Sequence, residues 1–357
     1  MASFAALILL VGCGQSNAQL EIATPGGTAR PASQFLTPRA TPGTVHFPSD
    51  DGPHDALTEW WYFTGHLTAA DGSEYGFEFV IFQGNRAGYP PTYAAHFAIT
   101  DVAKGEFHYD QRTQSGGQPQ SSKSIDLALG DWTLQGDGAN DQISASMSGY
   151  SIALSLTSTE PPALHSGDGY FEWAPATGSY YYSRTDMKVG GSITVGATRQ
   201  KVSGKAWMDH QWGNFLLFGG GGWDWYSIQL SNNEQIMLWH SRDSQNNVIF
   251  GSGTYVNDDG QTEEFSLGDF EITPTGTWTS PQSGAIYPSR WTITIPSKHL
   301  KLTIDPLIRD QELDTRASTG VIYWEGDVSI SGTEAGSSVS GQGYIELTGY
   351  ATNLSSP

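Results

Sequence analysis

Two stretches of this 357-residue chain resemble each other and indicate its architecture. Residues 59–67 read EWWYFTGHL, and residues 223–230 read WDWYSIQL. A second pair follows in the same order, since residues 202–209 read VSGKAWMD and residues 339–346 read VSGQGYIE. A motif that opens each half of the chain and a motif that closes it together predict two related units.

The composition indicates strands rather than helices. The chain contains 43 Gly, 12 Trp and 16 Tyr, and only 15% of its residues are charged. Aromatic and β-branched runs such as residues 75–83 (YGFEFVIFQ) alternate with turn dipeptides such as Asp71-Gly72 and Asp259-Gly260. No long amphipathic helical pattern follows the first dozen residues. We therefore expect an all-β fold.

The repeat sets the expected boundaries of the two units. We predict one unit over residues 44–213 and a second over residues 219–353, joined at the glycine run Gly219–Gly222. Each unit is long enough to close into an antiparallel β-barrel, a shape that leaves no unpaired sheet edge. The glycine run lacks the Lys and Ser/Thr of a phosphate-binding loop, so we interpret it as a linker.

Charge and histidine spacing limit the ligands that the chain can bind. The chain carries 17 Lys+Arg against 37 Asp+Glu, a net charge of −20. We exclude nucleic acid as a partner, because phosphate binding requires clustered basic side chains. The nine histidines, among them His46, His54, His66 and His96, show no metal-ligand spacing and have no cysteine partners. We therefore expect no metal ion and no cofactor.

The only cysteine, Cys13, follows an apolar run over residues 5–11 that is too short to span a bilayer. Residues 10–13 (LVGC) resemble a bacterial lipobox, so we interpret residues 1–18 as a signal peptide whose lipid-bearing residue is Cys13. Residues 19–43 are rich in Pro and Thr and predict a flexible tether. The expected location is the cell envelope, with the lipid anchor in the outer membrane and the protein facing the periplasm.

An ordinary secreted protein is the alternative to this lipid anchor. Cleavage after Asn17-Ala18 would release the chain without a lipid. The segment also departs from a typical signal peptide, because its first charged residue is Glu21 and no basic residue precedes the apolar run.

The two halves together resemble the AttH and carotenoid 1,2-hydratase family. The resemblance rests on residues 59–67, 75–79 (YGFEF) and 96–101 (HFAITD) in the first half, 206–213 (AWMDHQWG) at the join, and 224–226 (DWY), 287–291 (YPSRW), 323–326 (YWEG) and 343–350 (GYIELTGY) in the second half. It implies a tandem pair of lipocalin-like antiparallel β-barrels that hold an apolar ligand inside or between them. The family includes hydratases that add water to a carotenoid double bond and lipoproteins encoded beside ABC-type exporters.

The motif Asp209-His210-Gln211-Trp212 is the strongest candidate for catalysis. Strand alternation places His210 and Trp212 on one face and Asp209 on the other. Protonating an alkene requires an acid, which a desolvated Asp or His can supply, and an aromatic face that stabilises the cation. The resemblance implies catalytic roles for His210 and Trp212, whereas the Tyr and Asp that act further downstream in the hydratases have no clear match here. The alternative is a structural polar cluster that bridges the barrels.

Aromatic residues near the repeated motifs form the expected ligand-binding set. These residues, together with one carboxylate, are Trp60, Trp61, Tyr62, Trp225, Tyr226, Trp239, Trp324 and Glu325. Alternation lets only one of Trp60 and Trp61 face a barrel core, and a Trp that plugs the closed barrel end is the structural alternative. We expect Glu59 to pair with an arginine. Glu325 is expected to be structural if Arg184 or Arg290 pairs with it, and otherwise an acid with a raised pKa.

Two functions fit these features. The first is an envelope lipoprotein that binds an elongated apolar, isoprenoid-like or lipid-like molecule and acts on it as a hydro-lyase. The second is a non-enzymatic carrier or accessory of an AttH-type ABC export system, which the lipobox and tether favour. In both cases the expected partners are a hydrophobic small molecule or lipid and the membrane, and in the second also the transporter components.

Overall fold

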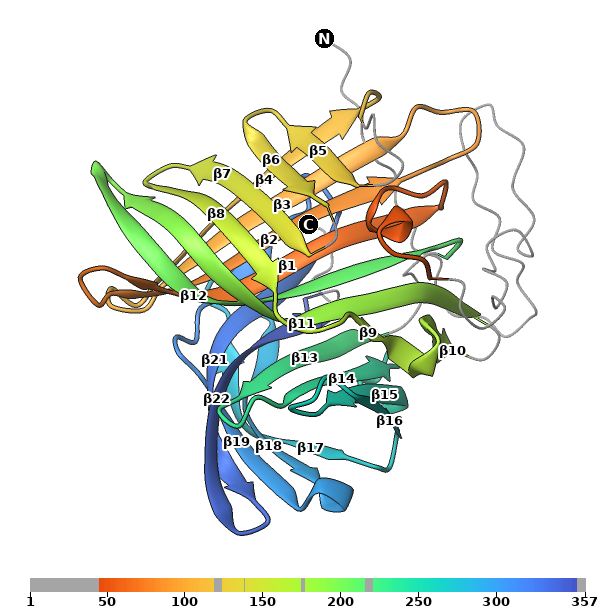
Figure 1. Ribbon diagram of the computed structural model, residues 1–357, viewed down its shortest axis with the longest axis vertical. Coiled ribbons are helices and arrows are strands. Elements are labelled where there is room, and N and C mark those ends of the chain that lie inside the picture. Colours follow the sequence, from red (N-terminus) through yellow and green to blue (C-terminus); the bar gives the residue numbers. More distant parts are fainter. Residues whose placement is uncertain (1–44, 119–123, 138, 175–176, 216–220, 352–357) are drawn as a thin grey trace.

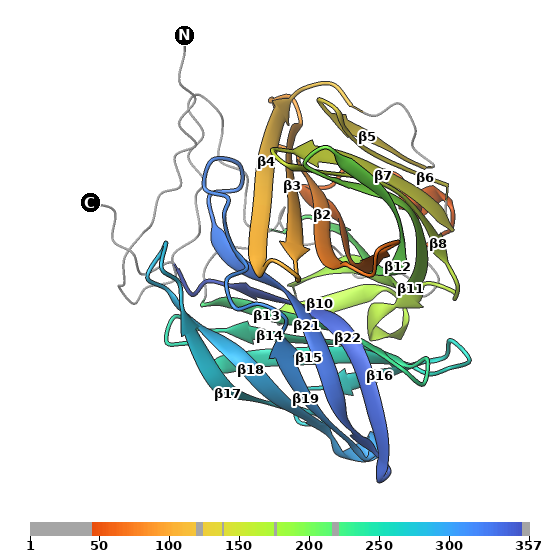
Figure 2. The ribbon, with the colours of Figure 1, turned by 90° about the vertical axis from the view of Figure 1, so that its left-hand side faces the viewer.

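The computed structural model confirms an all-β fold with two antiparallel sheets, stacked one on the other (Figures 1 and 2). It describes residues 45–118, 124–137, 139–174, 177–215 and 221–351. The predicted signal peptide, Cys13 and the tether lie outside these residues, as do residues 219–220 of the predicted linker. Within the described residues, no helix has the length and apolar character needed to cross a membrane.

The first sheet contains every described strand before residue 214. These strands are β1 (Thr58–Ala69), β2 (Glu74–Gly84), β3 (Thr92–Asp101), β4 (Glu106–Ser115), β5 (Ile125–Leu129), β6 (Trp132–Gly136), β7 (Asn140–Met147), β8 (Tyr150–Ser158), β9 (Ala163–Leu164), β10 (Tyr170–Ala174), β11 (Thr177–Val195) and β12 (Thr198–Gly213). Their order is β4-β3-β2-β1-β12-β11-β8-β7-β6-β5, with β9 and β10 paired to β11. The edge strands β4 and β5 lie next to each other, so this sheet is a nearly closed barrel.

The second sheet contains the strands after residue 221. These are β13 (Gly222–Leu230), β14 (Gln235–Arg242), β15 (Val248–Val256), β16 (Thr262–Ser266), β17 (Glu271–Thr279), β18 (Ile286–Ile295), β19 (Leu300–Pro306), β20 (Glu312–Asp314), β21 (Ile322–Glu334) and β22 (Ser337–Thr348). Their order is β16-β15-β14-β13-β22-β21-β19-β18-β17, with β20 paired to β21. Because the edge strands β16 and β17 are not paired in this order, the sheet is a half-barrel, less closed than the barrel we expected.

Three short 3-10 segments complete the described elements: η2 (Ser49–Asp51), η3 (His165–Gly167) and η4 (Pro296–Lys298).

The two repeated motifs form the central strand pairs of the two sheets. In each sheet the first strand pairs with the last, β1 with β12 and β13 with β22. The repeat keeps its register, because Leu67 lies opposite Gly204 and Leu230 lies opposite Gly341. A Cβ on Gly204 would lie 1.8 Å from the backbone oxygen of His66, so only glycine fits at this position.

Burial patterns along the strands show where the sheets meet. Strands β5 and β8 alternate buried and exposed residues, as expected when one face meets solvent. Most positions of β1, β12, β13 and β21 are buried on both faces. One face of each of these strands packs in the core of its own sheet, and the other packs between the sheets. Polar side chains on the second face are therefore removed from water.

Candidate functional site

The pairing of β1 with β12 organises the predicted site. His210 lies opposite Trp61, and Trp212 lies opposite Glu59. Both His210 and Trp212 point into the first barrel, with their ring centroids 4.7 Å apart, as strand alternation predicts. Asp209 points to the other face of β12, toward the second sheet. Alternation thus separates the predicted catalytic residues into two clusters.

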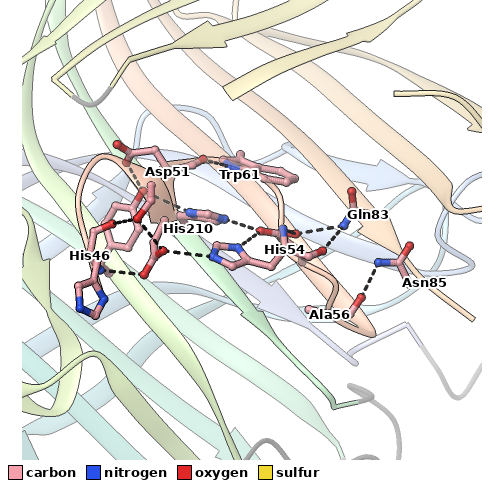
Figure 3. Close-up of polar contacts among 12 residues, drawn as sticks. His46, Asp51, His54, Ala56, Trp61, Gln83, Asn85 and His210 are labelled. Atoms are coloured by element: carbon pink, nitrogen blue, oxygen red, sulfur yellow. Dashed lines mark hydrogen bonds and ion pairs between the residues drawn. The ribbon is translucent and has the colours of Figure 1, made fainter. Parts of the chain in front are cut away.

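The first cluster, which we call the barrel cluster, consists of Asp51, His54, Glu59, Tyr182 and His210 (Figure 3). At its centre, Glu59 Oε1 lies 2.7 Å from His54 Nδ1 and 2.8 Å from His210 Nε2. The other carboxylate oxygen accepts a hydrogen bond from the backbone N–H of His54. The expectation that Glu59 pairs with an arginine is wrong, because the imidazoles of His54 and His210 are its partners.

Hydrogen bonds continue beyond His210 to a buried ion pair. His210 Nδ1 lies 3.2 Å from the hydroxyl oxygen of Tyr182, and that hydroxyl donates to Asp51. Arg184 also donates to Asp51. Both ring nitrogens of His210 therefore have partners, and its imidazole is fully buried.

Two effects set the charge of the imidazoles. Burial lowers the pKa of His210, although the contact with Glu59 opposes this. Burial also acts to lower the pKa of His54, but hydrogen bonds to Asp50 and Glu59 outweigh it and raise that pKa to about 9. Aromatic rings enclose both side chains: Trp212 stacks on His54 with centroids 4.1 Å apart, and Trp61 stacks on His210. The protein's own side chains thus occupy the space beside His210.

The second cluster lies between the sheets and consists of four carboxyl groups, Glu78, Asp209, Glu325 and Glu346, which we call the interface acids. They come from β2, β12, β21 and β22. Within the described residues, no Lys or Arg forms an ion pair with any of the four. Their hydrogen-bond donors are hydroxyl and indole groups.

Glu325 is the most enclosed of the interface acids. The hydroxyl of Tyr62 donates to Glu325 Oε1 at 2.6 Å, and Oε2 has no hydrogen-bond partner in the described structure. Burial raises the pKa of Glu325 well above its ordinary value, and the nearby carboxyls of Glu78 and Glu346 raise it further. The arginines considered as partners lie elsewhere: Arg184 bonds Asp51, and Arg290 pairs with an exposed aspartate. Glu325 is therefore a buried acid with a raised pKa.

The other interface acids are shifted in the same direction. Burial raises the pKa of Glu78 to about 8, although Tyr323 donates to its Oε1 at 2.8 Å. Burial raises the pKa of Glu346 to about 7 against a hydrogen bond from an indole. Burial raises the pKa of Asp209 to only about 6, because Tyr181, Ser183 and Trp207 donate hydrogen bonds to this carboxylate. Glu346 lies directly opposite Glu325 in the β21–β22 register, so ionising both is unfavourable.

A chain of hydrogen bonds links Glu78 to the protein surface. The hydroxyl of Tyr323 lies 2.7 Å from His96 Nδ1, and His96 Nε2 lies 3.0 Å from Ser318 Oγ. Ser318 donates to the side chain of Gln111. Burial lowers the pKa of His96 to about 3, so this imidazole is neutral and carries one donor and one acceptor nitrogen.

Gln111 belongs to a hollow on the surface. The hollow has a volume of about 510 Å³ and is lined by Tyr109, Gln111, Gln282, Asp314, Arg316 and Ala317. The chain through His96 therefore runs from Glu78 to this hollow.

Half-buried aromatic residues mark the edge of the interface. Trp60, Phe82, Trp223 and Trp239 pack around the buried rings of Tyr62, Trp207 and Trp225, and we call these four residues the aromatic rim. The indole of Trp223 donates to Glu346 Oε2 at 3.0 Å. The rim therefore adjoins the interface acids directly.

The predicted ligand-binding residues fall into three places. Trp61 faces the first barrel, whereas Tyr62, Trp225 and Glu325 lie between the sheets. Trp60 and Trp239 belong to the rim. Tyr226 and Trp324 pack in the core of the second sheet, where the ring centroid of each lies 6.1 Å from that of Trp291. They belong to neither cluster.

Sequence reasoning did not select five members of the two clusters, Asp51, His54, Tyr182, Glu78 and Glu346, nor the neighbouring His96. Glu78 and His96 stand alone within the apolar runs YGFEFVIF and AAHFAIT, a pattern that signals a buried titratable group. Glu346 entered only as the last residue of the repeated motif 339–346, where it aligns with Asp209. His54 gave no signal, because it precedes β1 and reaches His210 only through the fold.

Comparisons with known proteins identify similar chains. A family model described as AttH-like matches residues 38–350. A crystal structure described as an AttH protein from Nitrosomonas europaea has 31% identity and a TM-score of 0.78, over 87% of this chain and 100% of that one. Kievitone hydratase from Nectria haematococca has 18% identity and a TM-score of 0.71, over 88% and 98%. CghA, crystallised with Sch210972, has 14% identity and a TM-score of 0.53, over 90% and 98%. No curated protein matches.

Proposed function

The chain belongs to the AttH-like family, and from this premise we propose that it adds water to an alkene of an elongated apolar molecule. The reaction site in this proposal is the interface between the two sheets. The observation that carries it is Glu325, a fully buried carboxyl group with aromatic neighbours, which within the described residues has one unpartnered oxygen and no ion pair with Lys or Arg. Such a group keeps its proton at neutral pH, as a general acid for alkene protonation must.

The chemistry needs an acid and a base whose pKa values differ. Glu325 transfers its proton to one alkene carbon, and the π electrons form the new C–H bond, which leaves a carbocation. The ring of Trp225 packs edge-on against Tyr62 at 5.3 Å, so aromatic groups lie beside the developing positive charge. Water adds to the cation and gives up a proton to Glu346, the acid with the lower pKa. Proton transfer from Glu346 to Glu325 restores the resting state.

Access and proton exchange support this placement. The aromatic rim is a half-buried apolar surface beside Glu346, and in this proposal movement of the indole of Trp223 opens it to the ligand. The hydrogen-bonded chain through His96 and Tyr323 lets Glu78 exchange its proton with solvent. In the proposed cycle, the added water replaces, through Glu346, the proton that Glu325 gives to the alkene, so no net proton is drawn from solvent.

The proposal moves the proton donor away from His210. Its two ring nitrogens are already bonded to Glu59 and Tyr182, and burial lowers its pKa. An imidazole with these constraints is a poor acid for carbon. Asp209 remains near the site as a neighbour that raises the pKa of Glu325.

The first experiment uses the purified chain with a panel of acyclic carotenoids and shorter prenylated compounds in ¹⁸O-labelled water. We expect a hydroxylated product that carries the label. Glu325→Gln should lower turnover by about 100-fold or more, because it removes the acid while preserving the shape of the side chain. Glu74→Gln, at an exposed position, is the matched control and should leave turnover unchanged. Turnover that is equally high in Glu325→Gln would refute the proposal.

A non-enzymatic carrier is the second candidate. The close packing around both clusters favours it, because a ligand at the aromatic rim could bind without reaching the acids. Binding of the same polyenes without any labelled product, together with weaker binding by Trp239→Ala, would support a carrier. Co-isolation with ABC transporter components would then link it to export.

We also propose that the protein is a lipoprotein of the cell envelope, anchored through Cys13. The lipobox-like residues 10–13 support this, as does the Pro- and Thr-rich stretch that follows. Feeding cells a clickable fatty acid should label the wild-type chain and leave Cys13→Ser unlabelled. Equal labelling of both chains, or recovery of wild-type protein only as a free secreted form, would refute the anchor.

A further inference from the structure

We propose that the barrel cluster holds a divalent metal ion of the zinc class, bound by His54, Glu59 and His210. This site is separate from the interface acids, and the inference does not depend on alkene hydration. Its three ligand atoms, His54 Nδ1, Glu59 Oε1 and His210 Nε2, lie within 4.8 Å of one another. They come from the segment before β1, from β1 itself and from β12, so only the folded chain brings them together.

The donor set matches the chemistry of zinc. Two imidazole nitrogens and one carboxylate oxygen are a ligand set that Zn²⁺ and Co²⁺ favour, and a fourth position then remains for water. Ligand atoms of a tetrahedral zinc site lie about 3.3 Å apart, given bond lengths near 2.0 Å. To hold a metal, the N···O distances of 2.7 and 2.8 Å lengthen as the ion replaces the protons between these atoms, and the two imidazole nitrogens, now within 4.8 Å of each other, move closer together.

Outer hydrogen bonds hold the ligands as metal sites require. A ligating histidine usually bonds a second group through its other ring nitrogen, and here His210 Nδ1 lies 3.2 Å from the Tyr182 hydroxyl, which donates to Asp51. Gln83 donates to the second oxygen of Glu59 at 3.1 Å. These contacts fix the direction of the ligand atoms.

Charge and access also favour a cation. His54 Nε2 lies 3.8 Å from Asp50 Oδ1, so the imidazole stands between two carboxyl groups, Asp50 and Glu59. Arg184 is bound to Asp51 and lies 3.9 Å from Asp141, and within the described residues it forms no ion pair with Glu59. The side chain of His54 is 22% exposed, whereas Glu59 is fully buried, so an ion enters past His54.

Aromatic rings surround the site. The stacking of Trp212 on His54 and of Trp61 on His210 restricts both imidazoles to one orientation. A site of this rigidity loses little conformational entropy when it binds an ion. The competing occupant is a proton, because a doubly protonated His54 would also satisfy the two flanking carboxylates.

Cobalt binding distinguishes these occupants. The full chain, freed of metal with a chelator and carrying no histidine tag, is titrated with Co²⁺ and then with Zn²⁺. We expect one equivalent of Co²⁺ to give the visible absorption of a four- or five-coordinate ion, and Zn²⁺ to abolish it by displacement. His54→Phe preserves the stacking on Trp212 but removes the ligand, and it should weaken metal binding by about 10-fold or more.

Two further variants keep the test decisive. Glu59→Gln preserves the size of the side chain and should also weaken binding. His108→Phe alters a histidine outside the barrel cluster, paired with Glu106, and should bind Co²⁺ as the wild type does. Absence of the cobalt spectrum in the wild type, or equal affinity in wild type, His54→Phe and Glu59→Gln, would overturn the proposal and leave the proton as the occupant.

Discussion

The barrel cluster and the interface acids bury the same functional group in two different ways. In the barrel cluster, Glu59 lies between two imidazoles and Asp51 is bonded to Arg184. Between the sheets, Glu78 and Glu325 each accept a hydrogen bond from a tyrosine hydroxyl at Oε1. In the described structure, the Oε2 atom of each has no hydrogen-bond partner. Nitrogen groups thus surround the carboxyls of the barrel cluster, whereas burial without such groups raises the pKa of Glu78 and Glu325. The first arrangement suits cation binding, and the second suits proton donation.

Removing Arg184, the ion-pair partner of Asp51 in the barrel cluster, tests this difference with the largest expected effect. Arg184→Met should lower the free energy of unfolding by about 3–5 kcal/mol, because it leaves the buried carboxyls of Asp51 and Asp141 without a cation. Urea denaturation followed by tryptophan fluorescence measures the loss. The matched control is Arg290→Met, whose ion pair with Asp305 is exposed and contributes about 0–1 kcal/mol.

Glu325→Gln, the corresponding change between the sheets, should lower the free energy of unfolding only slightly. Glu325→Gln keeps an oxygen for the Tyr62 hydroxyl, and it replaces a group that already carries no charge. We expect a change below about 1 kcal/mol near neutral pH. A loss as large as that of Arg184→Met would break the comparison.

A pH series sharpens the account of the interface acids. The pKa of Glu78 rises from 4.5 to about 8 on folding, so the protonated carboxyl stabilises the folded state. This contribution is complete below pH 4.5 and is lost as the pH rises through 8. Glu78→Gln should remove the loss, so that its stability relative to the wild type grows by up to about 1.4 kcal/mol per pH unit in that window. The exposed Glu74→Gln should show no such trend.

The stability contribution of His54 in the barrel cluster should change with pH over a higher range, and by a smaller amount, than that of Glu78. The pKa of His54 rises from 6.5 to about 9 in the folded state, owing to its bonds to Asp50 and Glu59. Its stabilising contribution is complete below pH 6.5 and disappears as the pH rises through 9. In the presence of a chelator, the advantage of the wild type over His54→Phe should therefore shrink between these values. A constant difference across this range would show that His54 does not gain a proton on folding.

The sequence predicted the framework better than the site. The repeated motifs predicted two related units, and in the structure the first and last strands of each unit pair in equivalent register, since Leu67 with Gly204 corresponds to Leu230 with Gly341. Alternation also placed His210 with Trp212 and away from Asp209. Both inferences rest on local geometry, which a sequence records directly.

The partners of the buried groups could not be predicted in the same way. His54, Glu59 and His210 form no local spacing, because His54 lies 156 positions before His210 (210 − 54). The acid role of Glu325 depends on which side chain donates to it in the folded protein. That donor is Tyr62, from the first sheet, rather than Arg184 or Arg290. The closure of the second sheet was also overestimated, since the repeat fixes its central strands but not its edges.

The protonation state of Glu325 is the most direct test of the central claim. Difference infrared spectroscopy of the wild type and Glu325→Gln, recorded near neutral pH and in both H₂O and D₂O, isolates the carbonyl stretch of this one side chain. The account predicts the band of a protonated carboxylic acid, shifted slightly in D₂O and persisting into mildly alkaline solution. The symmetric and antisymmetric bands of an ionised carboxylate in its place would contradict it.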